Sequence, residues 1–244
     1  MKLETSLSRS IAEIKRISGN SSDVMINTFV TGGIHCALIC CEGMVSASVI
    51  TELIFEPVTD IPPKKDSHEL FHFISENLLL STDRPTVQDY DTLFRLIHSG
   101  FAVLIAEDIG YGLGFGVQGY SARSVQEPSG ESNVMGAHEG FTETIRTNMS
   151  QIRRRLKTPE LVMELSFIGK QSHTDICICY MKDRVPKKLM DRIKSSIERN
   201  DLEAVLTTGY LRPFLEDGRF EIFNTTGTTE RPDMLCANII QGRI

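Results

Sequence analysis

The hydrophobic residues in the first half of the chain recur with two different periods. Recurrence every three or four residues, as at Ile11, Ile14 and Ile17, predicts helices that begin at Ser or Asp caps and end at Gly or Pro. The helices predicted in this way cover residues 6–17, 46–55, 67–80 and 89–98. Uninterrupted or alternating hydrophobic runs predict strands over residues 24–30, 35–41, 101–108 and 115–120. The first half is therefore expected to form an α/β unit of about four strands and several helices.

Glycine and proline set the expected boundaries inside this unit. Thr31, Gly32 and Gly33 join the first two strands, which are expected to form a hairpin. The helix over 46–55 is expected to end before Pro57, because the residue before a proline disfavours helical backbone. Residues 57–66 are then expected to form a loop.

A polar connector separates the two halves of the chain. Residues 121–139 contain Pro128, Gly130 and Gly136 and show no hydrophobic period, so they are expected to carry the domain boundary. Beyond the connector, helices are predicted over residues 141–157, 185–200, 201–206 and 229–243, and strands over residues 161–169 and 174–181. We therefore expect two small α/β subdomains, residues 1–120 and residues 121–244.

The composition excludes several classes of protein. Of 244 residues, 41% are hydrophobic and 24% are charged, and the net charge is −6, so nothing attracts the whole chain to nucleic acid or anionic lipid. No C-x-x-C occurs among the six cysteines, which predicts buried free thiols in a reducing compartment. No signal peptide and no run of about 20 apolar residues is present, so we expect a soluble, cytosol-like chain. The final Gly-Arg-Ile resembles the start of a further strand, which suggests a piece of a longer protein.

Three consecutive arginines, at 153–155, stand on the helix predicted over 141–157. Successive helical residues are about 100° apart, so the three side chains diverge and form no single basic face of the kind that nucleic acid requires. Arg146 and Arg153 border one side of the hydrophobic stripe, Asn148 and Arg155 border the other, and Arg154 points away from it. We interpret the bordering arginines as partners of carboxylates on neighbouring elements. The alternative is that one of them holds an anionic ligand.

The segment His68–His72 fits the zinc-hydrolase pattern H-E-x-x-H, which places two imidazoles on one helical face beside Glu69. A third ligand is required, but no Gly-x-x-His continuation follows, and His98 lies in a different predicted helix. We interpret the segment as a surface helix face, with a metal-dependent hydrolase through His68, Glu69 and His72 as the alternative.

Two further segments resemble ligand sites. The glycines between Gly110 and Gly116 precede alternating hydrophobic residues and no Lys-Ser/Thr, so we interpret them as a tight hairpin with closely packed backbones and not as a phosphate loop. In Thr-Glu-Arg-Pro-Asp, Thr229 and Asp233 suit a helix start. The alternative is that Glu230 or Arg231 faces a ligand or a partner domain. No residue stands in a recognisable nucleophile setting, so we expect neither an enzyme nor a cofactor.

Long stretches of the second half match a known family. The segments are Arg-Ser-Val-Gln-Glu-Pro, Gly-Ala-His-Glu-Gly-Phe-Thr-Glu-Thr-Ile-Arg-Thr-Asn with the three arginines, and Thr-Glu-Arg-Pro-Asp. With them the chain resembles the A subunits of the GerA family of bacterial spore germination receptors. The first half matches more weakly, through Gly-Asn-Ser-Ser-Asp-Val and Cys-Cys-Glu-Gly-Met-Val. Met135, Ala137 and His138 replace the proline and basic residues usual in the family, which weakens any anion-binding role for that loop.

The resemblance implies a fold and a cellular setting. The fold is two α/β subdomains with a cleft between them, as in small-molecule binding proteins. The chain would be the soluble N-terminal domain of an A subunit, facing the spore core, with its membrane domain absent. B and C subunits would be its partners at the inner membrane of the spore, in an oligomeric receptor. Amino acids or sugars would be the nutrient signal, with no role for nucleic acid.

The resemblance also suggests roles for residues near the connector. Candidate ligand-binding residues for the cleft are Arg123, Arg146, Asn148, Arg153, Glu230 and Arg231. Candidate residues for a structural junction between the subdomains are Glu127, Glu139, Glu143, Arg155 and Asp233. The counter-charges expected for the arginine helix are Glu127, Glu131, Glu139 and Glu230. Two functions remain open at this point: a domain that senses the nutrient, or an assembly and transmission module with no ligand site of its own.

Overall fold

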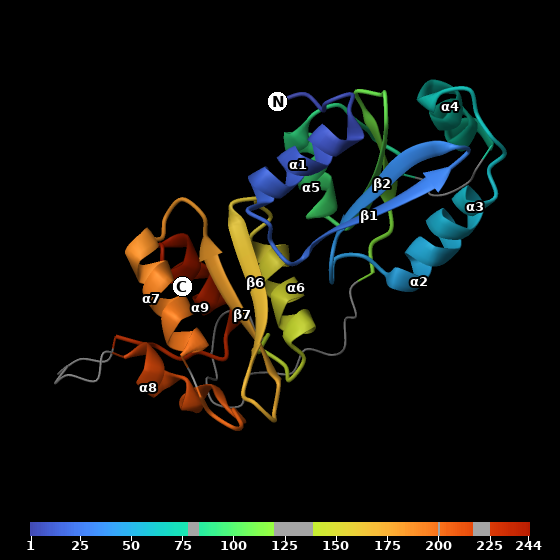
Figure 1. Cartoon of the computed structure of the whole chain (residues 1–244). Coiled ribbons are helices and arrows are strands. Elements are labelled where there is room, and N and C mark those ends of the chain that lie inside the picture. Colours follow the sequence, from blue (N-terminus) through green and yellow to red (C-terminus); the bar gives the residue numbers. More distant parts are fainter. Residues whose placement is uncertain (78–82, 120–138, 200, 217–224) are drawn as a thin grey trace. The chain divides into compact units, whose positions relative to one another are not determined.

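A computed structural model describes residues 1–77, 83–119, 139–199, 201–216 and 225–244 (Figure 1). The chain forms two compact units. Unit 1 comprises Met1–Arg123 and Met149–Leu161, and unit 2 comprises Ser124–Asn148 and Val162–Ile244. The sequence division at 120/121 assigned all of Met149–Leu161 to the second half, whereas the structure groups this segment with the first. The predicted fold class is confirmed as mixed α/β, and the sheet of unit 1 is antiparallel throughout.

Unit 1 is built on a five-stranded sheet with the strand order β1-β2-β4-β5-β3. Its strands are β1 (Val24–Thr31), β2 (Ile34–Cys41), β3 (Thr86–Val87), β4 (Phe101–Ala106) and β5 (Gly112–Gly116). Its helices are α1 (Leu7–Ser18), α2 (Ala47–Ile50), α3 (Glu56–Thr59), α4 (Ser67–Asn77) and α5 (Tyr90–Ile97). The β1–β2 hairpin is confirmed: Gly32 and Gly33 adopt φ values of 57° and 79°, which the tight two-residue turn requires.

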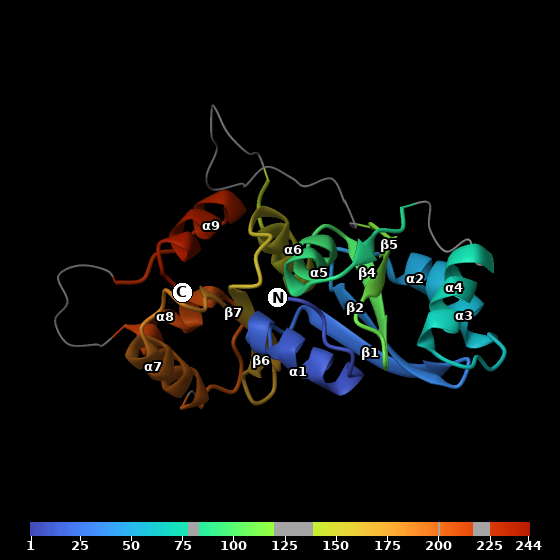
Figure 2. The ribbon, with the colours of Figure 1, turned by 90° about the horizontal axis from the view of Figure 1, so that it is seen from above.

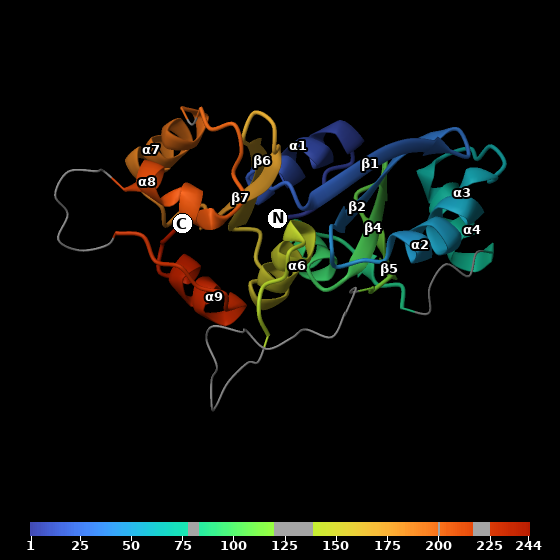
Figure 3. The ribbon, with the colours of Figure 1, turned by 90° about the horizontal axis from the view of Figure 1, so that it is seen from below.

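Helices cover both faces of this sheet, because consecutive strand residues point to opposite sides. On β2, Cys36, Leu38 and Cys40 pack in one hydrophobic core with α2, α3 and α4. Ala37 and Ile39 pack in the other core with α1 and α5. Figures 2 and 3 show the sheet between these two helical layers from above and below.

The helix that was expected to end before Pro57 continues to Thr59. A π-helical turn (Thr51–Phe55) connects α2 to α3, and the Glu56 amide donates to the Thr51 carbonyl across it. Pro57 is the second residue of α3 and directly follows the π-helical turn, where the hydrogen-bonding pattern changes. The prediction from Pro57 was wrong because it did not allow for this change of hydrogen-bonding pattern.

The glycine-rich stretch lies in a strand and not in a phosphate-binding loop. Gly112, Gly114 and Gly116 belong to β5, which pairs with both β4 and β3. A Cβ atom at Gly112 would lie 2.8 Å from the Leu104 carbonyl oxygen, so the backbones approach too closely for a side chain. The close packing expected for these glycines is therefore confirmed. The stretch was predicted to be the turn of a hairpin, but most of it forms strand β5.

Unit 2 contains a two-stranded sheet of β6 (Leu161–Ile168) and β7 (Thr174–Met181). Its helices are α7 (Lys187–Glu198), α8 (Arg212–Leu215) and α9 (Pro232–Ile240), with a 3-10 turn at Thr208–Tyr210. The helix predicted over 201–206 is wrong. The Leu202 and Glu203 carbonyls instead accept from the Lys170 and Gln171 amides, because this segment pairs with the turn between β6 and β7.

The arginine helix, α6 (Ile145–Arg155), contributes to both units: its first turn belongs to unit 2 and the rest to unit 1. It begins four residues later than Phe141, the predicted start. The Asn148 amide group explains the delay, since its Oδ1 accepts from the Thr142 amide at 2.7 Å and its Nδ2 donates to the Thr142 carbonyl at 2.7 Å. These bonds hold the preceding segment in a turn outside the helix.

Candidate functional site

Arg153 is the most deeply buried charged side chain of the arginine helix. Only 1% of its surface is exposed, and the same is true of Asp23, which lies immediately before β1 in the same unit. The guanidinium Nε donates to Asp23 Oδ2 at 2.6 Å, and Nη2 donates to Oδ1 at 2.9 Å. This is the two-bond, fork-to-carboxylate geometry that gives arginine its strongest ion pairs.

The remaining donors of Arg153 bind the backbone that follows the helix. Nη1 donates to the Thr158 carbonyl at 2.7 Å, and Nη2 donates to the Leu161 carbonyl at 2.9 Å. The guanidinium therefore joins three segments: the turn before β1, the end of α6 and the start of β6. A buried cation with its donors occupied by protein groups is a structural link and has little capacity to bind a ligand as well.

Asp23 is held in its charged form by the groups around it. Ser21 Oγ donates to Oδ1 at 2.5 Å and Cys41 Sγ donates to Oδ2 at 3.2 Å. Burial raises the pKa of Asp23, but the charge and hydrogen bonds of Arg153 outweigh burial and leave the pKa below its ordinary value. Burial and the neighbouring carboxylate raise the pKa of Cys41 well above the usual thiol value, so Cys41 stays protonated and keeps donating.

His98 completes this buried polar cluster at the end of α5. Its side chain has no exposed surface, and its ring lies 5.7 Å from the ring of Phe94. Burial, and then the positive charge of Arg153, lower the pKa of His98 to about 3. The Lys157 backbone faces the ring and slightly favours the charged form, but neither ring nitrogen reaches hydrogen-bonding geometry with a partner in the described part of the chain. His98 is therefore neutral at physiological pH.

The carboxylate partner of Arg153 differs from the one expected. The sequence suggested glutamates of the connector and of the last helix, but the partner is Asp23, which is 130 positions away. Arg154, which the helical spacing placed away from the hydrophobic stripe, is half-buried. No pattern in one sequence links a lone aspartate at the start of a strand to a distant arginine, so only the fold could reveal this pair.

The other candidate ligand and junction residues that the structure describes do not form one cluster around Arg153. Arg231 pairs with Asp233, with 2.6 Å between Nη2 and Oδ2. The N-cap of α9 is Arg231 and not Thr229, and no side chain that the structure describes caps this helix start. Arg155 donates to the Gln151 carbonyl at 2.9 Å. The exposed candidates are Arg146, Glu143 and Glu230, and Glu139 is half-buried. Arg123, Glu127 and Glu131 lie outside the described residues. The ligand and junction roles of all these side chains stay predictions.

The His68–His72 segment forms an exposed face of α4. Both histidines and Glu69 are exposed, whereas Leu70, Phe71 and Ile74 are buried. The Glu69 carboxylate accepts from the Lys65 amide at 2.9 Å and so serves the helix start. Among the residues that the structure describes, no group of three or more His, Cys, Asp or Glu side chains could hold a metal ion.

Replacing His68 and His72 together by alanine is expected to leave the melting temperature within about 2 °C of wild type, because both side chains are exposed. The zinc content of the purified chain, measured by atomic absorption, should also be unchanged. Stoichiometric zinc in the wild type that disappears in the double variant would restore the hydrolase alternative.

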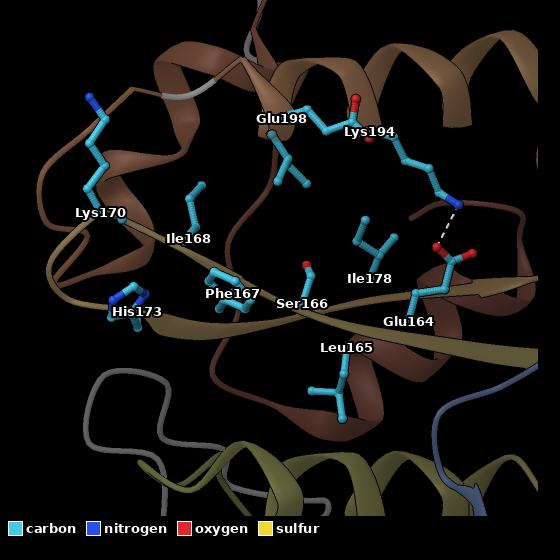
Figure 4. A pocket seen from close by; sticks show the side chains of 12 residues that line it. Glu164, Leu165, Ser166, Phe167, Ile168, Lys170, His173, Ile178, Lys194 and Glu198 are labelled. Atoms are coloured by element: carbon cyan, nitrogen blue, oxygen red, sulfur yellow. Dashed lines mark ion pairs between the residues drawn. The ribbon is translucent and has the colours of Figure 1, made fainter.

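Unit 2 has a pocket of about 490 Å³ between β6 and α7 (Figure 4). Ile168, Ile178 and Ile197 give it an apolar lining, and Phe167 stands 67% exposed beside them. Lys194 and Glu164 mark one end of the pocket, and Lys170 and His173 mark the other. Sequence patterns did not indicate this pocket, because its lining comes from β6, β7 and α7, whose hydrophobic residues look like ordinary core positions.

The charged end of the pocket is internally paired. Lys194 Nζ lies 2.6 Å from Glu164 Oε2, and the Tyr180 hydroxyl donates to Oε1 at 2.6 Å. Burial raises the pKa of Glu164, but the bonds from Lys194 and Tyr180 lower it below the ordinary value. The pocket therefore combines an apolar wall with two lysines and two glutamates, of which Lys194 and Glu164 are bound to each other.

The described helices include none with the length and apolar character needed to cross a membrane. The family described as "Bacillus/Clostridium GerA spore germination protein" matches residues 12–244. The chain belongs to the GerA spore germination family. The family resemblance inferred from the connector, the arginine helix and the Thr-Glu-Arg-Pro-Asp motif is thereby confirmed.

Individual members of the GerA family match along the whole chain. Spore germination protein KA of Bacillus subtilis is 32% identical over 99% of this chain and 45% of its own length. Spore germination protein B1 of the same organism is 27% identical over 100% of this chain and 50% of its own length. The crystal structure of the N-terminal domain of the A subunit of the Bacillus megaterium spore germinant receptor GerK3 superposes with a TM-score of 0.74, at 26% identity, over 100% of this chain and 91% of that one. The chain thus spans about half the length of the curated relatives it matches.

Proposed function

We propose that this chain is the N-terminal part of the A subunit of a spore germinant receptor and that it transmits the nutrient signal within that receptor. The observation that carries the proposal is the structural match to the N-terminal domain of the GerK3 A subunit, which extends over the entire chain. The absence of a recognisable nucleophile setting in the sequence agrees with a role in signalling and not in catalysis.

The same relationship supports a proposal for the receptor setting. The matched relatives are about twice as long as this chain, which leaves room for a membrane domain in the full-length protein. We propose that the receptor lies in the inner membrane of the spore, that this part faces the spore core, and that B and C subunits assemble with it. Amino acids or sugars are the proposed nutrient signals.

Helix α6 is the proposed transmission element. Arg153 fixes the C-terminal part of the helix to the Asp23 turn, and the first turn of the helix belongs to unit 2. A buried pair of this kind is costly to break, so this part of the helix moves with unit 1 as one body. A displacement at either end of α6 is then carried along a rigid element.

Exchanging Arg146 tests transmission in spores that carry the full-length receptor. Arg146 is exposed on the first turn of α6. Glycine there weakens the helix by about 1 kcal/mol relative to alanine, roughly a fivefold change in its local opening. Arg146→Gly is therefore expected to slow nutrient-triggered germination several-fold, measured by loss of absorbance, while Arg146→Ala germinates normally at the same receptor level.

The other outcomes of this experiment are informative as well. Equal loss in both Arg146 variants would favour the predicted ligand role of Arg146 over transmission. Normal germination in both would contradict transmission through α6. Spores that lack the full-length protein and still respond normally to every nutrient tested would contradict the receptor assignment itself.

Direct nutrient sensing is the second candidate function, and the pocket of unit 2 favours it. A small zwitterion with an apolar body would exchange its own charges into the Lys194–Glu164 ion pair and lay its apolar body on the isoleucine wall. Amide NMR titration of the chain with amino acids and sugars locates any site. Shifts at Ser166 and Lys194 would support the pocket, and shifts at Arg146 and Arg231 would support the cleft predicted from the sequence. No saturable shift at millimolar concentration would leave transmission as the function.

A further inference from the structure

Cys177 and Cys179 form a close pair of thiols on β7. They are two residues apart on a strand, so their side chains point to the same face of the sheet. Their sulfur atoms lie 3.5 Å apart, and neither cysteine is in a disulfide. Both side chains are half-buried, which leaves part of each accessible to solvent.

The other four cysteines are shielded from solvent and from oxidants. Cys36, Cys40, Cys41 and Cys236 are all buried, with at most 5% of their surface exposed. Burial raises the pKa of Cys36 to about 12, and burial with the nearby Glu42 charge raises that of Cys40 to about 11. Because the thiolate is the reactive form, Cys36, Cys40 and Cys41 are unreactive near neutral pH, and Cys236 is shielded by its burial. Accessibility and proximity therefore single out the Cys177–Cys179 pair.

We propose that Cys177 and Cys179 are a redox-active dithiol, which small-molecule disulfides convert reversibly into a disulfide within strand β7. One thiol loses its proton, and its thiolate attacks a sulfur of the small-molecule disulfide and releases one small thiol. The second thiolate then attacks the mixed disulfide, forms the Cys177–Cys179 bond and releases the other small thiol. The two cysteines are oxidised, the small disulfide is reduced, and the two protons end on the released thiols.

Strand geometry makes this disulfide easy to reduce again. Residues two apart on a strand have Cα atoms about 6.7 Å apart, close to the upper limit of about 6.8 Å for disulfides. The bond therefore forms only if the strand contracts slightly, and such strained bonds are the labile ones. This favours a reversible switch over a permanent cross-link.

The contraction would act on the elements that touch β7. β7 is paired with β6, and α9 packs against β7. Oxidation is thus expected to change the position of α9 relative to β7 within unit 2. The inference rests on the thiol geometry alone and holds whether or not the chain acts in a germination receptor.

The experiment uses the purified, fully reduced chain and oxidised glutathione under native conditions. After treatment, the chain is denatured, alkylated with iodoacetamide, digested with trypsin and analysed by mass spectrometry. Both thiols fall in the single tryptic peptide Gln171–Lys182, which contains no other cysteine. The expected product is this peptide without alkyl groups and lighter by two hydrogen atoms, while all other cysteines are alkylated. Dithiothreitol should restore the doubly alkylated form.

The variant Cys177→Ser provides the matched control. Its remaining thiol, Cys179, cannot close a ring and should accumulate as the glutathione adduct. Three results would overturn the proposal: the wild-type peptide stays fully alkylated after oxidation, it stops at a stable glutathione adduct, or the buried cysteines oxidise at the same rate. A wild-type disulfide together with a Cys177→Ser adduct would support it.

Discussion

Replacing Arg153 by alanine is expected to lower the free energy of unfolding by about 3–5 kcal/mol. The substitution leaves the Asp23 carboxylate buried without its cation, and it also removes donors from the Thr158 and Leu161 carbonyls. Denaturant unfolding followed by circular dichroism measures the loss. An effect of this size would unfold a large fraction of a marginally stable chain.

Arg146→Ala is the matched control, because Arg146 is the same residue type on the same helix and is exposed. Its effect is expected to stay within about 0.5 kcal/mol. Arg153→Lys keeps the charge but loses the two-bond fork, so it should lie between the wild type and Arg153→Ala. Wild-type stability of Arg153→Ala combined with failed germination at normal receptor levels would replace the structural role of Arg153 by a signalling or ligand role.

A second large effect is expected from pH, through His98. The pKa of His98 is about 3 in the folded chain and about 6.5 in the unfolded chain. Between these values the unfolded chain binds more protons, so stability falls as pH decreases from about 6.5 towards 3. At about 1.4 kcal/mol per pH unit, the loss at pH 5 is roughly 2 kcal/mol relative to pH 7.5.

Asp23 also makes the folded chain less stable as the pH falls, but at lower pH than His98. Its folded pKa is depressed, so the stability it contributes is present above the unfolded value of about 3.9 and is lost as pH falls through the folded pKa. His98→Leu separates the two groups. The variant should lose the decline between pH 6.5 and 4 and keep the steeper decline below 4. An unchanged pH profile in His98→Leu would mean that His98 is not the group responsible.

Much of the fold could be predicted from local patterns. The hairpin at Gly32 and Gly33, the Asp89 cap of α5 and the Pro232 start of α9 follow from the preferences of single residues, and the structure contains all three. Where a prediction was wrong, a contact distant in sequence decided the conformation. Residues 201–206 have helical spacing, but they pair with the turn that begins at Lys170.

The candidate site was less predictable than the fold. The sequence singled out the arginine helix and predicted that its arginines pair with carboxylates, which Arg153 does. It could not identify Asp23, because a bond between distant positions leaves no periodic trace in one sequence. The pocket between β6 and α7 was missed because its lining depends on packing. Cys177 and Cys179 stand two apart on a predicted strand, so their shared face was predictable. The expectation that the cysteines are buried was wrong for these two, which are half-buried.

The central claim is that Arg153 links α6 to the Asp23 turn, and a double-mutant cycle tests it most directly. Arg153→Ala, Asp23→Ala and the double variant are compared with the wild type by denaturant unfolding. Each single substitution leaves one buried charge without its partner, whereas the double substitution removes both charges. The double variant should therefore lose less stability than the two single variants added together. We predict an interaction energy of at least about 2 kcal/mol. Losses that add to within about 0.5 kcal/mol would show that the two side chains do not depend on each other and would contradict the account.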